Sequence, residues 1–263
     1  MRTLWGFTTQ SYHYSTIYRF NYWVNLLTRI LLMYSVYWLW ISLFSQQHKS
    51  FEVSLEQMIT YGIIGMVLPY FLEGGIKNYI ADKVQKGEIE TDLIRPIDFQ
   101  MHMIFRSLST IIVNLVIFIL PLMIISLLIF EVTFPRSITD IALLLFSIFF
   151  AYTISFSIEF LMGILSFITL SIQHFNWAYY TLITFLSGQM VPLWFFPDYI
   201  RVVSELLPFR CMYEIPLAIF IGKFTAWEAI QALSFQFCWG VILVSVSRYT
   251  WLKVYKRLAV QGG

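Results

Sequence analysis

Three charged side chains fall inside otherwise apolar stretches of the sequence, and they are the first candidates for chemistry. Arg29, Glu73 and Glu159 each lie in a run long enough to cross a bilayer. Charges in hydrocarbon are costly, so such residues commonly pair with one another or face a polar pathway. Two interpretations are open. Either Arg29 neutralises one or both glutamates at the inner mouth of a pathway, or the three make ordinary structural contacts while reaching towards water.

Motifs for catalysis, nucleotide binding or metal binding are missing from the sequence. The one Gly-Lys pair, Gly222-Lys223, lacks the spacing of a G-x-x-x-x-G-K-[ST] phosphate loop. Neither H-E-x-x-H nor G-x-S-x-G occurs, and Cys211 and Cys238 are too far apart in sequence for a C-x-x-C site. The histidines are also far apart; they are His13, His48, His102 and His174. We therefore expect no catalytic residue, metal or cofactor in this chain.

The composition indicates a lipid environment. Hydrophobic residues make up 59% of the chain and charged residues 12%, whereas soluble domains have about 45 to 50% and about 25%. Nine Trp and 16 Tyr are typical of the aromatic belts at membrane surfaces. A net charge of +2 without a basic run argues against a nucleic-acid partner. An all-α integral membrane protein with a single transmembrane domain over residues 1–263 is expected.

Six apolar stretches have the length of about 20 residues that a spanning helix needs. They are Tyr22 to Phe44, Met58 to Ile80, Ile104 to Phe130, Ile138 to Phe167, Ala178 to Phe196 and Ile230 to Tyr249. Six crossings would place both termini on one side, together with most of the Lys and Arg residues that flank the spans. Because cytoplasmic loops are rich in Lys and Arg, both termini are predicted to be cytoplasmic.

Residues 81–103 form the one long charged stretch on that predicted cytoplasmic side. Lys77 to Lys86 should continue the second span as a polar helix, and Gly87 should interrupt it. A short helix should follow and stop before Pro96, since the residue preceding a proline disfavours the helical conformation. Ile89 and Leu93 are four residues apart and should share one face. Such a helix either lies on the inner leaflet or docks in a groove of a soluble partner.

Two further segments do not read as simple spans. Residues 188–225 are apolar but are broken by Pro192, Pro197, Pro208 and Pro216, and a pair of short helices that dip into the outer leaflet is expected. Residues 1–20 mix aromatic and polar side chains, which is typical of a helix in the headgroup plane.

The order of these features resembles the permease subunits of type-2 ATP-binding-cassette exporters. The segment Gly87-Glu88-Ile89-Glu90-Thr91-Asp92-Leu93-Ile94-Arg95-Pro96 is similar to a G-x-I-x-x-x-L-x-x-P pattern of a bacterial branch. The late segment is also similar, through Ser187-Gly188, Pro192, Phe196-Pro197, Leu207-Pro208-Phe209, Pro216 and Gly222. The resemblance covers nearly the whole chain.

The resemblance implies a dimer of permeases, identical or homologous, in a bacterial plasma membrane, with two separate ATPase subunits that bind ATP and Mg²⁺. It implies that one set of residues couples the permease to the ATPase, namely Gly87, Glu88, Ile89, Asp92, Leu93, Arg95 and Pro96. It implies that a second set belongs to re-entrant helices at the extracellular exit, namely Gly188, Pro192, Pro197, Pro208 and Phe209.

Two other functions remain as alternatives. A proton-coupled secondary transporter would use Glu73 or Glu159, but it predicts paired broken helices in both halves, and the sequence has a conspicuous break only in the second half. An intramembrane lipid-modifying enzyme would need His, Asp or Ser groups converging at one depth, and no such set stands out in the sequence.

Overall fold

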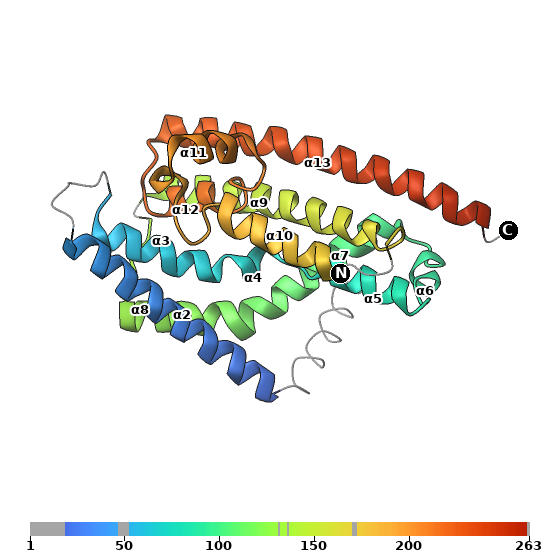
Figure 1. Cartoon of the computed structure of the whole chain (residues 1–263), viewed down its shortest axis with the longest axis horizontal. Coiled ribbons are helices and arrows are strands. Elements are labelled where there is room, and N and C mark those ends of the chain that lie inside the picture. The colour runs from blue at the N-terminus through green and yellow to red at the C-terminus, as the bar shows by residue number, and fades with distance from the viewer. Residues whose placement is uncertain (1–18, 47–52, 131, 136, 170–172, 262–263) are drawn as a thin grey trace.

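The computed structural model describes residues 19–46, 53–130, 132–135, 137–169 and 173–261, and every regular element in these ranges is helical (Figure 1). The interfacial helix predicted for residues 1–20 lies almost wholly outside the described residues. In chain order the elements are α2 (Arg19–Gln46), α3 (Leu55–Val67), α4 (Pro69–Leu72), α5 (Ile76–Gln85), α6 (Glu90–Leu93), α7 (Phe99–Asn114), the π-helical turn η1 (Leu115–Ile119), α8 (Leu120–Phe130), α9 (Ile138–Leu165), α10 (Gln173–Leu186), the 3₁₀ turn η2 (Leu193–Phe195), α11 (Asp198–Leu206), α12 (Glu214–Phe220) and α13 (Ala226–Gln261).

Five stretches in the described part of the chain are long and apolar enough to cross a membrane. They are Tyr22–Ser45, Leu55–Leu72, Phe99–Phe130, Ile138–Leu165 and Ala226–Lys256. These match five of the six predicted spans in position. The chain is therefore an all-helical protein of multi-pass membrane type.

The second predicted span is shorter than expected, because the helix does not continue through Ile80. It starts at a capping box between Ser54 and Gln57 and ends at Leu72. Glu73 then adopts an extended conformation, and Gly75 has a φ of 69°, a left-handed value that glycine accepts without steric strain. The prediction of one unbroken helix into Lys86 was wrong: α5 is a separate helix that starts after this break.

The fifth predicted span, Ala178 to Phe196, also differs from the structure. The helix α10 has 14 residues and ends at Leu186, so it is about 21 Å long, against a hydrocarbon core of about 30 Å. It stops where Gly188 takes a φ of 73° and where the hydroxyl of Tyr61 donates a hydrogen bond of 2.6 Å to the Gly188 carbonyl. The remaining residues to Phe196 form turns.

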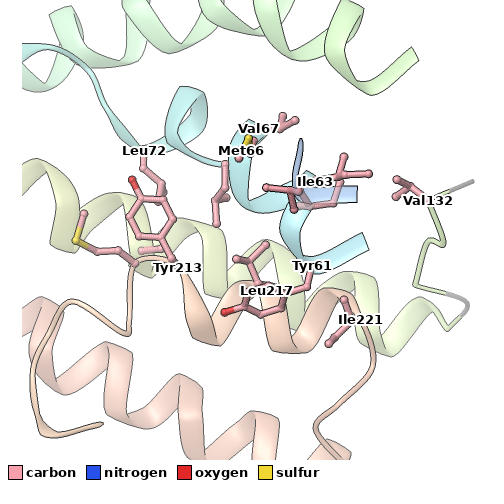
Figure 2. Close-up of a cluster of buried hydrophobic side chains, with 14 of the residues drawn as sticks. Tyr61, Ile63, Met66, Val67, Leu72, Val132, Tyr213, Leu217 and Ile221 are labelled. Carbon is pink, nitrogen blue, oxygen red and sulfur yellow. The ribbon is translucent and has the colours of Figure 1, made fainter. Parts of the chain in front are cut away.

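Helix α9 lies at the centre of the packing and contacts α5, α12 and α13. One apolar cluster joins α3 and α4 to the segment that contains α12, and Figure 2 shows Tyr61, Met66 and Leu72 beside Tyr213 and Leu217. A second cluster, at the end that holds α5 and α6, contains Ile76, Ile80, Ile89, Phe99, Met103, Phe156, Phe160, Ile164 and Trp251.

Helices α9 and α13 run in the same direction. Ser147 donates to Gln236 near their first halves at 3.0 Å, and the rings of Phe160 and Trp251 lie 6.1 Å apart near their last halves. The chain between α9 and α13 therefore has to return along the length of the bundle, and α10 runs in that return direction (Figure 1). Figure 1 also shows α5, α6 and the C-terminus at one end of the molecule and α11 and α12 at the other.

Candidate functional site

The candidate site has two parts at the end of the bundle that holds α5. The first is the segment of residues 87–98, called here the coupling segment. Helix α5 ends in a paired turn in which Gly87 N donates to Val84 O at 3.1 Å and Glu88 N donates to Lys83 O at 2.9 Å. This arrangement needs a left-handed residue, and Gly87 supplies it with a φ of 68°. The glycine thus turns the chain back over α5.

Asp92 anchors the coupling segment to α5. Its carboxylate is 1% exposed; it accepts a hydrogen bond of 2.7 Å from the hydroxyl of Tyr79 and lies 3.3 Å from the Nε of Arg95. Burial and the hydrogen bond to Asp92 raise the pKa of Tyr79 to about 12, so this phenol stays a donor at neutral pH. The guanidinium of Arg106 lies 3.5 Å from the centre of the Tyr79 ring. The segment is therefore held to α5 by polar contacts that converge on the buried carboxylate of Asp92.

Two surface ion pairs join the coupling segment to its neighbours. Lys83 lies 2.7 Å from Glu88, and the hydrogen bond from Lys83 holds the pKa of Glu88 below its usual value. At the other end, Asp98 caps α7 through the Met101 amide and lies 2.7 Å from Arg248 of α13. A polar cavity of ≈ 470 Å³ lies between α5 and α6. The segment thus contacts α5, α7 and α13.

The apolar side chains of the coupling segment face in two directions. Ile89 and Leu93 lie on one side, as expected, and that side packs into the second apolar cluster of this same chain. Ile94 is 81% exposed, and Pro96 and Ile97 beside it are also exposed. The outward-facing surface therefore combines the apolar Ile94, Pro96 and Ile97 with polar and charged residues that include Glu88, Glu90 and Arg95. Sequence reasoning did not single out Ile94, although its position one residue beyond the face that Ile89 and Leu93 share was a signal that could have found it.

The second part of the site is a buried cluster at the break between α4 and α5, called here the Lys77 cluster. Lys77 and Glu159 are each 1% exposed, and their charged atoms lie 3.9 Å apart. The Lys77 ammonium also lies 4.3 Å from the ring centres of both Tyr179 and Tyr180, a separation at which a cation is attracted to an aromatic face. Glu159 accepts a hydrogen bond from the Ile76 amide at 3.2 Å. The first turn of α5 is therefore fixed to α9 and α10.

Glu73 occupies the break itself and is held by two tyrosine hydroxyls. Tyr180 donates to one oxygen at 3.2 Å, and Tyr213 donates to the other at 3.3 Å. Arg29 lies over the ring of Tyr70, with its guanidinium carbon 5.4 Å from the ring centre. The structure thus pairs Glu159 with Lys77, a residue that sequence reasoning counted only among basic flanking positions. The sequence does hold a signal for Lys77 as a buried partner: it is a basic residue four positions after Glu73, and a glycine pair that could break the helix lies between them.

Residues 188–225 contain two short helices, α11 and α12, while the predicted dip of this segment into the outer leaflet stays a prediction. Pro192 and Pro197 precede η2 and α11 directly, while Pro208 is buried and Phe209 packs against the large apolar cluster. Helix α12 is buried on nearly every side, and its Glu214 lies 3.1 Å from Arg210. Gly188 ends α10. Gly188, Pro192, Pro197, Pro208 and Phe209 therefore all lie in one unit at the end opposite the coupling segment.

In the described part of the chain, no group of three or more His, Cys, Asp or Glu side chains is placed to hold a metal ion. The conserved profile of the ABC-2 family transporter proteins matches residues 31–262, which is most of the chain. No individual curated protein matches alongside it. With five membrane-length helices and a profile match over this range, the chain belongs to the ABC-2 family of transporter membrane proteins.

Proposed function

We propose that this chain is the permease subunit of an ATP-binding-cassette exporter in a bacterial plasma membrane. It forms the translocation pathway together with a second permease, identical or homologous, and two separate ATPase subunits drive it by binding ATP and Mg²⁺. Membership of the ABC-2 family supports transport as the activity. The coupling residues, the dimer and the direction of transport are parts of the proposal.

One observation carries this proposal. The coupling segment presents an apolar side chain that is 81% exposed, Ile94, on a turn held by the buried Asp92 network. Together with the exposed Pro96 and Ile97, this side chain makes an apolar patch beside charged residues, and such patches commonly mark protein interaction sites. Because the same segment is joined through α5 to the Lys77 cluster, a push at Ile94 would reach α9 and α10. Closure of the ATPases would move the coupling segment, and the helices around the break would shift to open the pathway outwards.

The proposed topology has six crossings with both termini in the cytoplasm. The parallel α9 and α13 require one return crossing, and α10 followed by the turns to Phe196 supplies it. Non-helical backbone at membrane depth requires cover from other protein, and α3 gives such cover through the bond between Tyr61 and Gly188. The end that holds the coupling segment also carries exposed basic residues, which supports its cytoplasmic placement: Lys86, Arg95, Lys253 and Lys256.

A second permease is favoured by polar groups on the outer face of α10. Tyr180 is 48% exposed, and its hydroxyl bonds Glu73 at the edge of the bundle. A polar pair on a lipid-facing surface is unfavourable, and a second permease packed against α10 would cover it. The segment of α11 and α12 would then close the extracellular exit between the two copies.

The test replaces Ile94 and Arg95 by Ala and measures co-purification with the ATPase. The matched control replaces Tyr199 and Arg201 by Ala, since these are an exposed apolar and a basic residue at the opposite end. Loss of a docking anchor should reduce the retained ATPase by roughly tenfold or more, and the control should retain it. Equal retention by both variants would contradict the proposed docking surface.

The buried pair of Lys77 and Glu159 is the specific observation that favours a proton-coupled secondary transporter as the second candidate. Transport measured in reconstituted vesicles distinguishes the two candidate functions. An exporter permease reconstituted without ATPase moves no solute uphill when a proton gradient is imposed, whereas a proton-coupled transporter does so, and Glu159→Gln abolishes it.

A further inference from the structure

The last helix extends well past the bilayer. Helix α13 has 36 residues and is about 54 Å long, while the hydrocarbon core is about 30 Å thick. A crossing that starts near Ile230 reaches its twentieth residue at Tyr249. The turns from Thr250 to Gln261 therefore project beyond the membrane at the end that holds the coupling segment (Figure 1).

Helix α13 is fixed to the coupling segment and to the start of α7 at the point where it leaves the membrane. The ring of Trp251 stacks on Phe99 with centroids 4.4 Å apart, and Arg248 lies 2.7 Å from Asp98. Gln100 adds a buried hydrogen bond of 3.1 Å to Ser247. The two elements consequently form one rigid surface.

A groove of ≈ 330 Å³ lies between them. Its walls include Pro96 and Ile97 from the coupling segment and Leu252 and Tyr255 from α13. Ile97, Leu252 and Tyr255 are 41%, 43% and 47% exposed, so the groove is open and presents apolar side chains beside the polar atoms of its lining. The acid in its wall, Asp98, is already paired with Arg248.

The rim of the groove is basic. Arg95 lies in the groove's own wall, and Lys253 and Lys256 are exposed on the same turns of α13 as the wall residues Leu252 and Tyr255. A matching partner therefore presents an apolar side chain among acidic residues. The groove is continuous with the coupling segment through Arg95 and Pro96, so the protein that docks on Ile94 also reaches it.

We propose that this groove is a second docking site for the ATPase subunit, which grips the projecting end of α13 as well as the coupling segment. The inference rests on the proposed function and adds a contact to it. Since α9 and α13 pack in parallel, this second contact ties movement of the ATPase to both helices at once.

The test incorporates a photo-crosslinking amino acid at Tyr255 in the full-length permease co-expressed with an ATPase that carries the G-x-x-x-x-G-K-[ST] loop. Tyr249, also a tyrosine of α13 and 70% exposed, is the matched control position. A crosslink to the ATPase from position 255 and none from position 249 is expected. In addition, Lys253→Glu with Lys256→Glu should reduce the retained ATPase by roughly tenfold.

Three outcomes would count against the inference, and they differ in what else they affect. Crosslinks from position 255 to lipid alone would assign the groove to the membrane surface, and crosslinks to another permease copy would assign it to the dimer. Full retention of the ATPase by the Lys253→Glu, Lys256→Glu variant would show that these two lysines make no charge contact with the ATPase. Each of these leaves the proposed function in place if the wild-type chain still retains the ATPase. If the wild-type chain retains none, both proposals fail together.

Discussion

The ammonium of Lys77 lies 3.9 Å from the carboxylate of Glu159, and both side chains are 1% exposed. This pair joins the first turn of α5 to the last third of the central helix α9, directly after the break at Glu73. Movement of α5 is therefore transmitted to α9 through charged groups that have little access to water.

Lys77→Met should destabilise the protein, because Glu159 would be left as a buried charge without its partner. Breaking a buried pair on one side commonly costs about 3 to 5 kcal/mol. The thermal unfolding midpoint in detergent should fall, and the double variant Lys77→Met, Glu159→Gln should recover much of it. An unchanged midpoint in the single variant would show that the pair contributes little.

Tyr79→Phe should loosen the coupling segment without unfolding the bundle. It removes the hydroxyl that donates to the buried Asp92, and an unsatisfied buried acceptor costs about 1 to 3 kcal/mol. Hydrogen exchange of the amides of residues 88–94 should become faster. Tyr199→Phe, at a side chain that is 73% exposed, is the control and should leave the exchange unchanged.

Ile89→Ala and Ile94→Ala should separate packing from docking within the same short segment. Ile89 is 9% exposed and lies in an apolar cluster, so its truncation should cost about 2 kcal/mol or more in stability. Ile94 is 81% exposed, so its truncation should change stability by less than about 0.5 kcal/mol and weaken ATPase binding. A large loss of stability in Ile94→Ala would mean that this side chain is packed, not presented.

Gly74→Ala should be far more damaging than Gly240→Ala. A Cβ at position 74 would overlap Ser107 of α7, whereas a Cβ at position 240 meets nothing within 4 Å. Overpacking at position 74 should cost about 1 to 3 kcal/mol, while helical position 240, where an added Cβ meets open space, should be neutral or slightly stabilised. The ordering of unfolding midpoints in detergent checks this, and Gly74→Ala with Ser107→Gly should restore part of the loss.

Cysteine accessibility should place Glu90 and Tyr199 on opposite sides of the membrane. Both residues are exposed, at opposite ends of the bundle, and Cys211→Ser with Cys238→Ser provides a background without native thiols. With the proposed topology, a membrane-impermeant maleimide applied to intact cells should label Tyr199→Cys and spare Glu90→Cys until the membrane is opened. Labelling of both positions in intact cells would exclude the six-crossing arrangement.

Much of the architecture was readable from local sequence patterns. Long apolar runs predicted five of the crossing helices, because a helix in lipid satisfies its own backbone hydrogen bonds and needs only length and hydrophobicity. Gly87 marked the turn that ends α5, because glycine allows a left-handed backbone. Pro96 marked the limit of the short helix, because a proline restricts the residue before it. The profile match supports the family to which this order of features pointed.

Local patterns could not predict the helix break, the ion pairing or the side-chain exposure, because these depend on residues that are distant in sequence. Glu73 and Gly75 interrupt a helix that apolar composition alone would continue, and the break is held by Tyr180 and Tyr213, which lie more than a hundred positions away. Glu159 selects Lys77 over Arg29 because α5 packs on α9 while Arg29 rests on Tyr70. Ile89 is buried and Ile94 exposed through the way α6 folds back onto Phe99 and Trp251. Hydrophobicity and backbone preferences act between neighbouring residues, so they can be predicted from the sequence. The pairing of charges and the exposure of side chains depend on which helices pack together, and only the tertiary structure determines that.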